Sequence, residues 1–108
     1  MILRRDIFQA IADPTRRSIL ILLASQSITA GAIADQFDAA RSTVSKHIQI
    51  LTECDLIESS QRGREIYYQI KMDKVKEIDV WLDQLKRVWD ERFNNLDKYL
   101  EKIQQNKL

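Results

Sequence analysis

Apolar residues recur every three or four positions along the first part of the chain, which is the spacing of one face of an α-helix. Asp13 and Pro14 have the order of an N-cap and a first helical residue, so a helix is predicted from there to about residue 24. Thr29 offers the N-cap of a third helix, which is predicted to end at residues 38–39. A short helix before Asp13 is predicted by the spacing of Ile2, Leu3, Ile7, Phe8 and Ile11.

The segment Arg41–Leu51 has the clearest division between an apolar and a polar face. Val44, Ile48 and Leu51 follow one another at steps of four and three, so they share one side of a helix. The other side is polar and cationic, and residues 39–52 contain no Asp or Glu. With the third helix and a connection of about three or four residues, this segment has the proportions of a helix-turn-helix. We expect its outer face to enter the major groove of DNA.

After Asp55 the apolar pattern changes from helical to alternating, which predicts β-strands. The two strands flank the turn Gln61-Arg62-Gly63-Arg64, in which Gly63 supplies a backbone conformation that other residues avoid. Residues 59–64 contain two arginines and no acid. The fold class predicted is therefore mainly α with a small, cationic β-hairpin, a winged helix-turn-helix.

The stretch from residue 73 to residue 103 contains neither Gly nor Pro and keeps a broad apolar stripe. Thirty residues of helix span roughly 45 Å, which is longer than so small a domain needs for its own core. We therefore predict a single domain, with core and wing in residues 1–72 and a dimerisation helix in residues 73–104. The predicted dimer interface consists of Ile2, Leu3, Ile78, Trp81, Leu82, Leu85, Val88, Trp89 and Leu96.

Composition narrows the class of protein. The 108 residues are 44% apolar and 31% charged, with two glycines and one proline, which indicates an ordered, helix-rich chain. The net charge is only +1, so a nucleic-acid partner has to be inferred from where the charges lie. One cysteine excludes an internal disulfide framework and fits a reducing compartment. The first residues have neither the pattern of a signal peptide nor that of a membrane span, so we expect a cytoplasmic protein.

The candidate DNA-binding side chains lie in two groups. Hydroxyl, amide and cationic groups of the first group can reach bases or phosphates, and those of the second can lie beside the backbone. The alternative is that both groups are ordinary solvated surface, with arginines flanking a turn for solubility. The candidates are Arg41, Ser42, Thr43, Ser45, Lys46, His47 and Gln49 on the helix, and Gln61, Arg62, Gly63 and Arg64 in the wing.

Several residues allow a second interpretation. His47 either donates to a phosphate or packs against the scaffold, and a metal role is the least expected because it lacks partners at suitable spacing. Cys54 is expected to act as a small buried apolar residue, with a redox-sensing thiol as the alternative. Trp81, Trp89 and Tyr99 are expected to pack in a core or interface rather than line a ligand pocket. Arg16 and Arg17 are expected on the solvated side of their helix and are weaker DNA candidates.

The motifs FQAIADPTRRSILILLA, IADQF, STVSKHIQIL and RGREIYYQI, taken together, resemble the ArsR/SmtB family of bacterial repressors over roughly residues 5–71. The resemblance implies a homodimeric repressor with two recognition helices in successive major grooves of an imperfect inverted repeat. Metal-sensing members carry a cysteine pair in the third helix or Asp and His ligands in the last. Here the third helix has no Cys or His and the last has no His, so the chain resembles the members that do not sense metals.

Two departures from the family pattern concern the ends of the recognition helix. Asp55 replaces the usual glycine after it, and Asp tolerates a left-handed turn better than most residues. Ala40 stands where a Ser cap is common and has no side-chain acceptor, so either the cap is missing or Ser42 supplies it.

The sequence thus predicts a transcriptional regulator, a homodimeric repressor that binds double-stranded DNA without a chemical step, a metal or a cofactor. The alternative is a winged-helix module that binds a partner protein through its last helix. An enzyme is disfavoured because no phosphate-binding loop or catalytic carboxylate pair is present. The inducing signal stays open between a small molecule in the dimer cleft, a protein antagonist, oxidation of Cys54 and the repressor's own concentration.

Overall fold

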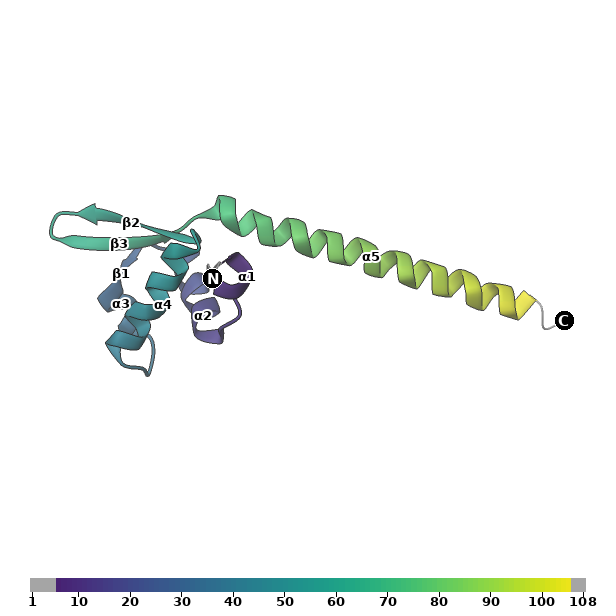
Figure 1. Ribbon diagram of the computed structural model, residues 1–108, viewed down its shortest axis with the longest axis horizontal. Helices are drawn as coiled ribbons and strands as arrows, with labels where there is room; N and C mark the ends of the chain where they lie inside the picture. Colours follow the sequence, from purple (N-terminus) through teal and green to yellow (C-terminus); the bar gives the residue numbers. More distant parts are fainter. Residues whose placement is uncertain (1–5, 106–108) are drawn as a thin grey trace, which may run out of the picture. The chain divides into compact units, whose positions relative to one another are not determined.

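The computed structural model describes residues 6–105. It divides between Lys76 and Glu77 into two compact units, the second of which is a continuation of the last helix (Figure 1). The fold class predicted from the sequence is confirmed: the chain is mainly helical with a small antiparallel sheet, and a long helix ends it. The elements are α1 (Ile7–Ala10), α2 (Pro14–Leu23), β1 (Ile28–Thr29), α3 (Ala30–Asp35), α4 (Arg41–Glu53), β2 (Ile57–Arg62), β3 (Glu65–Ile70) and α5 (Met72–Gln105).

Side-chain caps start α2 and α3 where the sequence predicted them. The Asp13 carboxylate accepts from the backbone N–H groups of Thr15 at 2.8 Å and Arg16 at 3.1 Å, and Pro14 is the first residue of α2. The Thr29 hydroxyl accepts from the N–H of Ala32 at 3.2 Å. These oxygens satisfy donors that the first turn of a helix leaves without an intrahelical partner.

α1 is shorter than predicted, because a cap stands immediately before it. Asp6 is extended, and its carboxylate accepts from the N–H of Gln9 at 2.9 Å, while the Gln9 side chain accepts from the N–H of Asp6 at 3.3 Å. This reciprocal capping box begins the helix at Ile7. Ile2 and Leu3, which were assigned to this helix and to the dimer interface, lie outside the described residues.

α3 also ends earlier than predicted, at Asp35 rather than at residues 38–39. Its last turn tightens: the N–H of Gln36 donates to Ile33 O at 3.1 Å and that of Phe37 to Ala34 O at 3.2 Å. Such three-residue bonds replace the α-helical pattern at a terminus. The connection to α4 therefore runs over residues 36–40 and is longer than the predicted three or four residues.

The apolar face predicted for α4 is confirmed as part of the core. Val44, Ile48 and Leu51 are 1%, 3% and 0% exposed. The helix ends in a Schellman-type turn, in which the N–H of Leu56 donates to Leu51 O at 3.1 Å. Asp55 has a φ of 64° in this turn, so it takes the left-handed conformation for which a glycine is usual.

The sheet has three strands, in the order β1-β3-β2, where the sequence predicted two. The missed strand, β1, pairs Ile28 with Tyr68 and Thr29 with Tyr67. Two residues are too few for an alternating pattern, so this strand is defined only by its partner. The hairpin strands reach Arg62 and Glu65, which leaves a tighter turn than predicted, and Gly63 has a φ of 64° in it.

One core joins α1–α4 to the sheet, and within residues 6–105 it buries no charged or polar residue. Because each buried side chain comes from an apolar position of its element, packing fixes the orientation of α4 and hence of its outer face. The buried residues are Ile7, Ala10, Ile19, Leu23, Ile33, Ala34, Val44, Ile48, Leu51, Cys54, Leu56 and Ile57.

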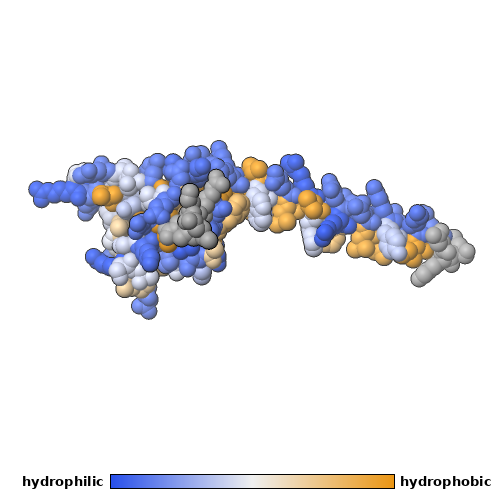
Figure 2. Space-filling view, viewed as in Figure 1, coloured by the Kyte–Doolittle hydropathy of each residue, from blue (hydrophilic) through white to orange (hydrophobic). Residues whose placement is uncertain are grey.

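α5 has 34 residues and thus spans about 51 Å. None of its side chains is buried in the single chain. Apolar side chains follow one edge of this helix and charged ones the other (Figure 2). No helix within residues 6–105 is both long and apolar enough to cross a bilayer. The apolar residues of the exposed edge, from Leu82 on, are Leu82, Leu85, Trp89, Phe93, Leu96, Leu100 and Ile103.

Candidate nucleic-acid interface

The outer face of α4 presents its polar side chains together. Apolar residues fill the core side of the helix, and the DNA-binding candidates predicted from the sequence lie on the rest of its surface. His47 is the exception, since it is half-buried at the boundary between the two faces. The exposed candidates are Arg41, Ser42, Thr43, Ser45, Lys46 and Gln49.

The first turn of α4 lacks a side-chain cap. Ala40 is the N-cap residue, with an extended backbone, and no side chain accepts from the first-turn N–H groups. Ser42 therefore lies inside the helix and is not its cap. Uncapped N–H groups at a helix start attract anions, because the helix dipole is positive there. The start of α4 is thus suited to a phosphate oxygen.

Arg41 contacts an acid that the sequence pattern did not place nearby. Its guanidinium lies 3.7 Å from a carboxylate oxygen of Asp35 at the end of α3, and the two side chains are 77% and 69% exposed. A pair this exposed is screened by water and salt and contributes little to stability. Arg41 is therefore loosely held, and a phosphate can replace Asp35 as its partner.

His47 packs against Arg16 of α2, so the expectation that Arg16 lies on the solvated side is wrong. Arg16 Nη1 is 3.3 Å from His47 Nδ1. The same guanidinium donates from Nε to Ala10 O at 2.7 Å and from Nη2 to Gln9 O at 3.0 Å. These carbonyls belong to the last two residues of α1. Only the tertiary fold brings these groups together.

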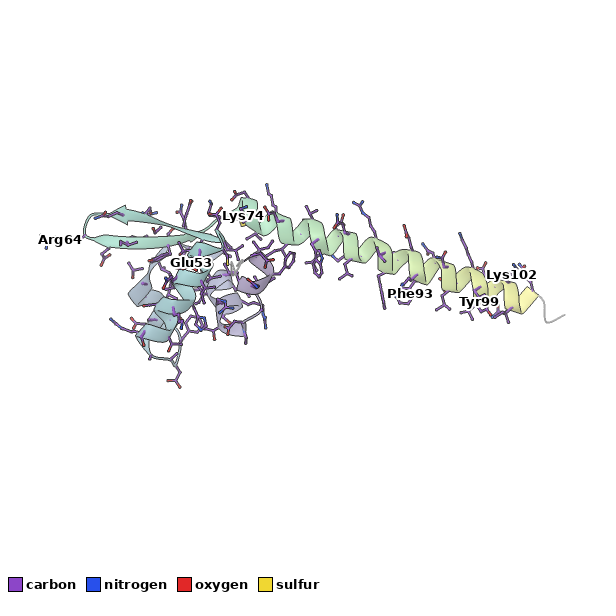
Figure 3. The ribbon with its side chains drawn as sticks, in the orientation of Figure 1. Glu53, Arg64, Lys74, Phe93, Tyr99 and Lys102 are labelled. Atoms are coloured by element: carbon purple, nitrogen blue, oxygen red, sulfur yellow. The ribbon has the colours of Figure 1, made fainter. Side chains whose placement is uncertain are left out.

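The two arginines of the wing are held differently. The Arg62 guanidinium carbon lies 4.8 Å from the centre of the Tyr67 ring, which is a cation–π distance. The Tyr67 hydroxyl in turn donates to Glu65 at 3.1 Å. Arg64 lies at the tip of the hairpin (Figure 3), and it is exposed. The Arg62 guanidinium is therefore held against a ring of the neighbouring strand β3, whereas Arg64 is exposed in the turn.

A groove of about 390 Å³ lies between α4 and the wing. Glu53 is the last residue of α4 and lines this groove, and its carboxylate accepts from the amide of Gln49 at 3.2 Å. This bond uses one N–H of the Gln49 amide, which leaves the second N–H and the carbonyl oxygen for a contact with a base. The residues that line the groove are Ser45, Ile48, Gln49, Thr52, Glu53, Ser59 and Tyr68.

Two carboxylates with shifted pKa values support the scaffold behind this face. The backbone N–H of Arg16 is the main cause that lowers the pKa of Asp13, and the hydrogen bond from the N–H of Thr15 contributes. The hydrogen bond from Lys71, 2.8 Å long, is the main cause that lowers the pKa of Asp55. Both carboxylates are thus stabilised as anions at the ends of helices.

The surface offers hydrogen-bond donors and positive charge. Within residues 6–105, no three His, Cys, Asp or Glu side chains gather as they would around a metal ion. Cys54 is 6% exposed and belongs to the core, as the apolar interpretation predicted. The arrangement is suited to holding an anionic polymer through side chains of α4 and the wing.

Comparison with known proteins gives consistent matches. A family model described as a helix-turn-helix domain matches residues 11–60. The chain is 36% identical over 77 residues to the transcriptional repressor SdpR of Bacillus subtilis, which covers 71% of this chain and 86% of that protein. It is 37% identical over 81 residues to an uncharacterised helix-turn-helix transcriptional regulator of Methanocaldococcus jannaschii, covering 74% and 91% of the two chains.

Solved structures agree with these sequence matches. An ArsR family transcriptional regulator aligns with a TM-score of 0.70 and 33% identity, covering 78% of this chain and 92% of that one. An ArsR-like transcriptional regulator from Rhodococcus aligns with a TM-score of 0.76 and 29% identity, covering 89% and 88%. The second alignment includes more of this chain than the first.

Proposed function

The chain belongs to the ArsR family of DNA-binding helix-turn-helix transcriptional regulators, and on that basis we propose that it is a homodimeric repressor that binds an inverted-repeat operator. It acts by occupying the operator, with no chemical step. The observation that carries the proposal is the outer face of α4. Six polar side chains of this helix are exposed, while its opposite side is buried in the core. The repressor named SdpR supports the direction of regulation.

In this proposal α4 lies in the major groove and the wing lies beside it. Thr43 and Lys46 are central on the exposed face and read base edges, while Ser42 and Ser45 place hydroxyls near phosphates. Arg41 exchanges its loose contact with Asp35 for a phosphate. Gln61, Arg62, Gly63 and Arg64 form the wing, with Arg64 free to follow the backbone.

The proposed dimer uses the apolar edge of α5. Leu85 and Leu96 are 50% and 51% exposed in the single chain, and a continuous row of such residues along a helix calls for an apolar partner. A second copy supplies the same row, and two-fold pairing of like surfaces is the commonest form of oligomer. Ile78, Trp81, Leu82, Val88 and Trp89 complete the described part of the proposed interface.

A two-fold dimer places equivalent recognition helices about 34 Å apart, so half-site centres are expected near one turn of DNA. Selection of bound genomic fragments, followed by sequencing, gives the operator. An inverted repeat with that spacing is the expected result. Isolated half-sites would contradict the dimeric part of the proposal.

The salt dependence of DNA binding distinguishes the proposed role of the wing from that of the recognition helix. Arg62→Ala with Arg64→Ala is expected to weaken binding to all sequences and to lower the slope of log K against log salt by about 2. Thr43→Ala is expected to change the base preferred at one position of each half-site, by about 5- to 100-fold in affinity, and to leave the slope unchanged. Unchanged isotherms for all these variants would overturn the assignment of the face.

The dimer is tested with a matched pair on α5. Leu82→Asp places a charge on the apolar edge, whereas Val80→Asp places the same charge two residues away, on the opposite side of the helix. Sedimentation is expected to show a monomer only for Leu82→Asp, with operator affinity at least 100-fold lower, because half-sites are then bound singly. A protein-interaction module would instead show no steep salt-dependent binding to DNA in the unmodified chain.

A further inference from the structure

Arg16 connects three segments through one guanidinium. Its Nε and Nη2 donate to the carbonyls of Ala10 and Gln9 at the end of α1, and its Nη1 lies 3.3 Å from His47 Nδ1 on α4. The Asp13 carboxylate accepts from the backbone N–H of Arg16 at 3.1 Å, which fixes where this side chain begins. A planar group with three nitrogens in use has little freedom to turn.

The neighbouring arginine provides a contrast. Arg17 Nη1 donates to Ile11 O at 2.7 Å, so it also binds a carbonyl at the end of α1. Its side chain is exposed, whereas that of Arg16 is part-buried. Among the residues described, both arginines therefore support the corner between α1 and α2, but Arg16 is the one that extends this support to the recognition helix.

The contact determines how His47 carries its proton. A guanidinium has donors only, so Nδ1 must be the acceptor in this hydrogen bond. The proton of the neutral ring therefore lies on Nε2, the nitrogen on the other side of the ring. On a helix, Thr43 is the neighbour one turn before His47 and is fully on the exposed face. His47 is half-buried at the boundary of that face, and a neutral ring that accepts from Arg16 has its one N–H donor at Nε2.

We propose that Arg16 is a positioning residue for DNA recognition, which holds His47 in the Nε2–H tautomer so that this N–H donates to a phosphate oxygen beside the bases read by α4. The inference rests on the proposed function, because it requires α4 to face DNA. Arg16 itself does not contact DNA in this arrangement. It orients the imidazole from behind, in the way that a fixed partner sets the tautomer of other functional histidines.

The tautomer is tested in the unmodified protein, without DNA. The chain has one histidine, so its two ring nitrogens give the only imidazole signals in a long-range ¹H–¹⁵N spectrum. At a pH where the ring is neutral, Nδ1 is expected at the shift of an acceptor nitrogen and Nε2 at that of a protonated one. Signals of the Nδ1–H tautomer would overturn the proposal before any variant is made.

Two variants separate positioning from general support of the fold. Arg16→Met removes the bond to His47 and is expected to move both ¹⁵N shifts towards an average of the tautomers. Arg17→Met removes a carbonyl contact of the same corner and is expected to leave the shifts as they are. Equal shifts in the two variants would overturn the proposal. If Arg16→Met fails to fold, Arg16→Lys is used instead. Lysine keeps the positive charge but cannot reach the three acceptors of Arg16 at once, so the two imidazole ¹⁵N shifts are expected to move in the same way as in Arg16→Met.

DNA binding is tested with substitutions that imitate one ring nitrogen each. His47→Gln places an amide donor near the position of Nε2, whereas His47→Asn keeps a short acceptor towards Arg16 and has no donor at that reach. His47→Gln is expected to bind operator within about 3-fold of the unmodified protein, and His47→Asn about 3- to 10-fold more weakly. The salt slope should not change in either, because no charge is lost.

The coupling between the two residues completes the test. Arg16→Met and His47→Ala should each weaken operator binding by about 3- to 10-fold, and the double variant no further than His47→Ala alone. Multiplying effects would show that Arg16 acts independently of His47 and would overturn the inference alone. Absence of steep, salt-dependent DNA binding in the unmodified protein would instead overturn the proposed function, whatever the tautomer.

Discussion

α4 and α5 are both amphipathic helices, and they differ in which face is left exposed. The apolar side chains of α4 are covered by the other helices and the sheet, and Leu51 is 0% exposed. The apolar side chains of α5 are open in the single chain, and Leu85 is 50% exposed. Phe93 and Tyr99 lie along one edge of α5 and Lys102 along the other (Figure 3). The same helical spacing of apolar residues thus gives a buried face in α4 and an exposed one in α5.

The difference supports a different proposed partner for each helix. A helix with a covered apolar face meets its surroundings through polar groups, which suits water or a polyanion. A helix with an open apolar face is suited to a second apolar surface, because its burial removes that area from water. The proposals that α4 binds DNA and that α5 binds a second copy both draw on this contrast. Measurements of stability, of helix capping and of pH dependence each test one part of it.

The largest expected difference comes from shortening one leucine on each helix. Leu51→Ala should lower the free energy of unfolding by about 2–5 kcal/mol at any protein concentration, because it leaves a cavity in the core. Leu85→Ala should act mainly through association, so its effect should diminish when the protein is diluted. Urea unfolding at two concentrations distinguishes them, with Val80→Ala as the control. Equal, concentration-independent losses would show that the α5 face is covered within the chain.

Local sequence was sufficient to predict the helix caps and turns, where a single residue type favours one backbone conformation or one capping bond. Asp13, Thr29 and Gly63 take the cap and turn positions predicted for them, and Asp55 takes the left-handed conformation. The end of α3 was placed too late, because Phe37 continued the apolar period although the helix had already ended at Asp35. Single-residue conformational preferences were thus better guides than the length of an apolar run.

Contacts between distant segments were not predictable in the same way. β1 has two residues and exists through its pairing with β3, which lies about forty residues later. Arg16 has the pattern of a solvated helix residue, yet its partners are the carbonyls of α1 and the ring of His47. A long polar side chain gives no periodic signal of its partner. The site was therefore predicted as a list of exposed residues, without the support behind His47.

A smaller effect is expected from adding the cap that α4 lacks. Ala40→Ser supplies an oxygen at the N-cap and should raise the free energy of unfolding by about 0.5–1 kcal/mol. Ser42→Ala should leave it within about 0.5 kcal/mol, because Ser42 caps nothing. Thermal and urea unfolding measure both. A loss of about 1 kcal/mol in Ser42→Ala would mean that the helix begins two residues later. This pair of variants tests whether α4 is held by packing rather than by its ends.

The smallest expected effect concerns the connection between the two helices. Lys71 directly precedes α5, and Asp55 follows the end of α4. Lys71 Nζ donates to Asp55 Oδ1 at 2.8 Å, and this bond lowers the pKa of the Asp55 carboxyl. A carboxyl with a lowered pKa stabilises the folded state above its unfolded pKa of about 3.9, and this contribution is lost as the pH falls through the folded pKa. Stability should therefore decrease on acidification below about pH 4.

Asp55→Asn keeps a residue that tolerates the left-handed turn but cannot form the ion pair. It should be less stable than the unmodified chain at pH 7 and should lose less on acidification, so the two curves of urea midpoint against pH converge at low pH. Lys71→Met should give the same convergence, while Asp13→Asn should remove a separate part of the acid transition, because its carboxylate caps α2. Parallel curves for Asp55→Asn and the unmodified chain would contradict the role of this ion pair. The dissociation constant of the proposed dimer should be the same in Asp55→Asn and in the unmodified chain. Converging stability curves with an unchanged dissociation constant would mean that the Asp55–Lys71 pair supports α4, and that association depends on the apolar edge of α5 instead.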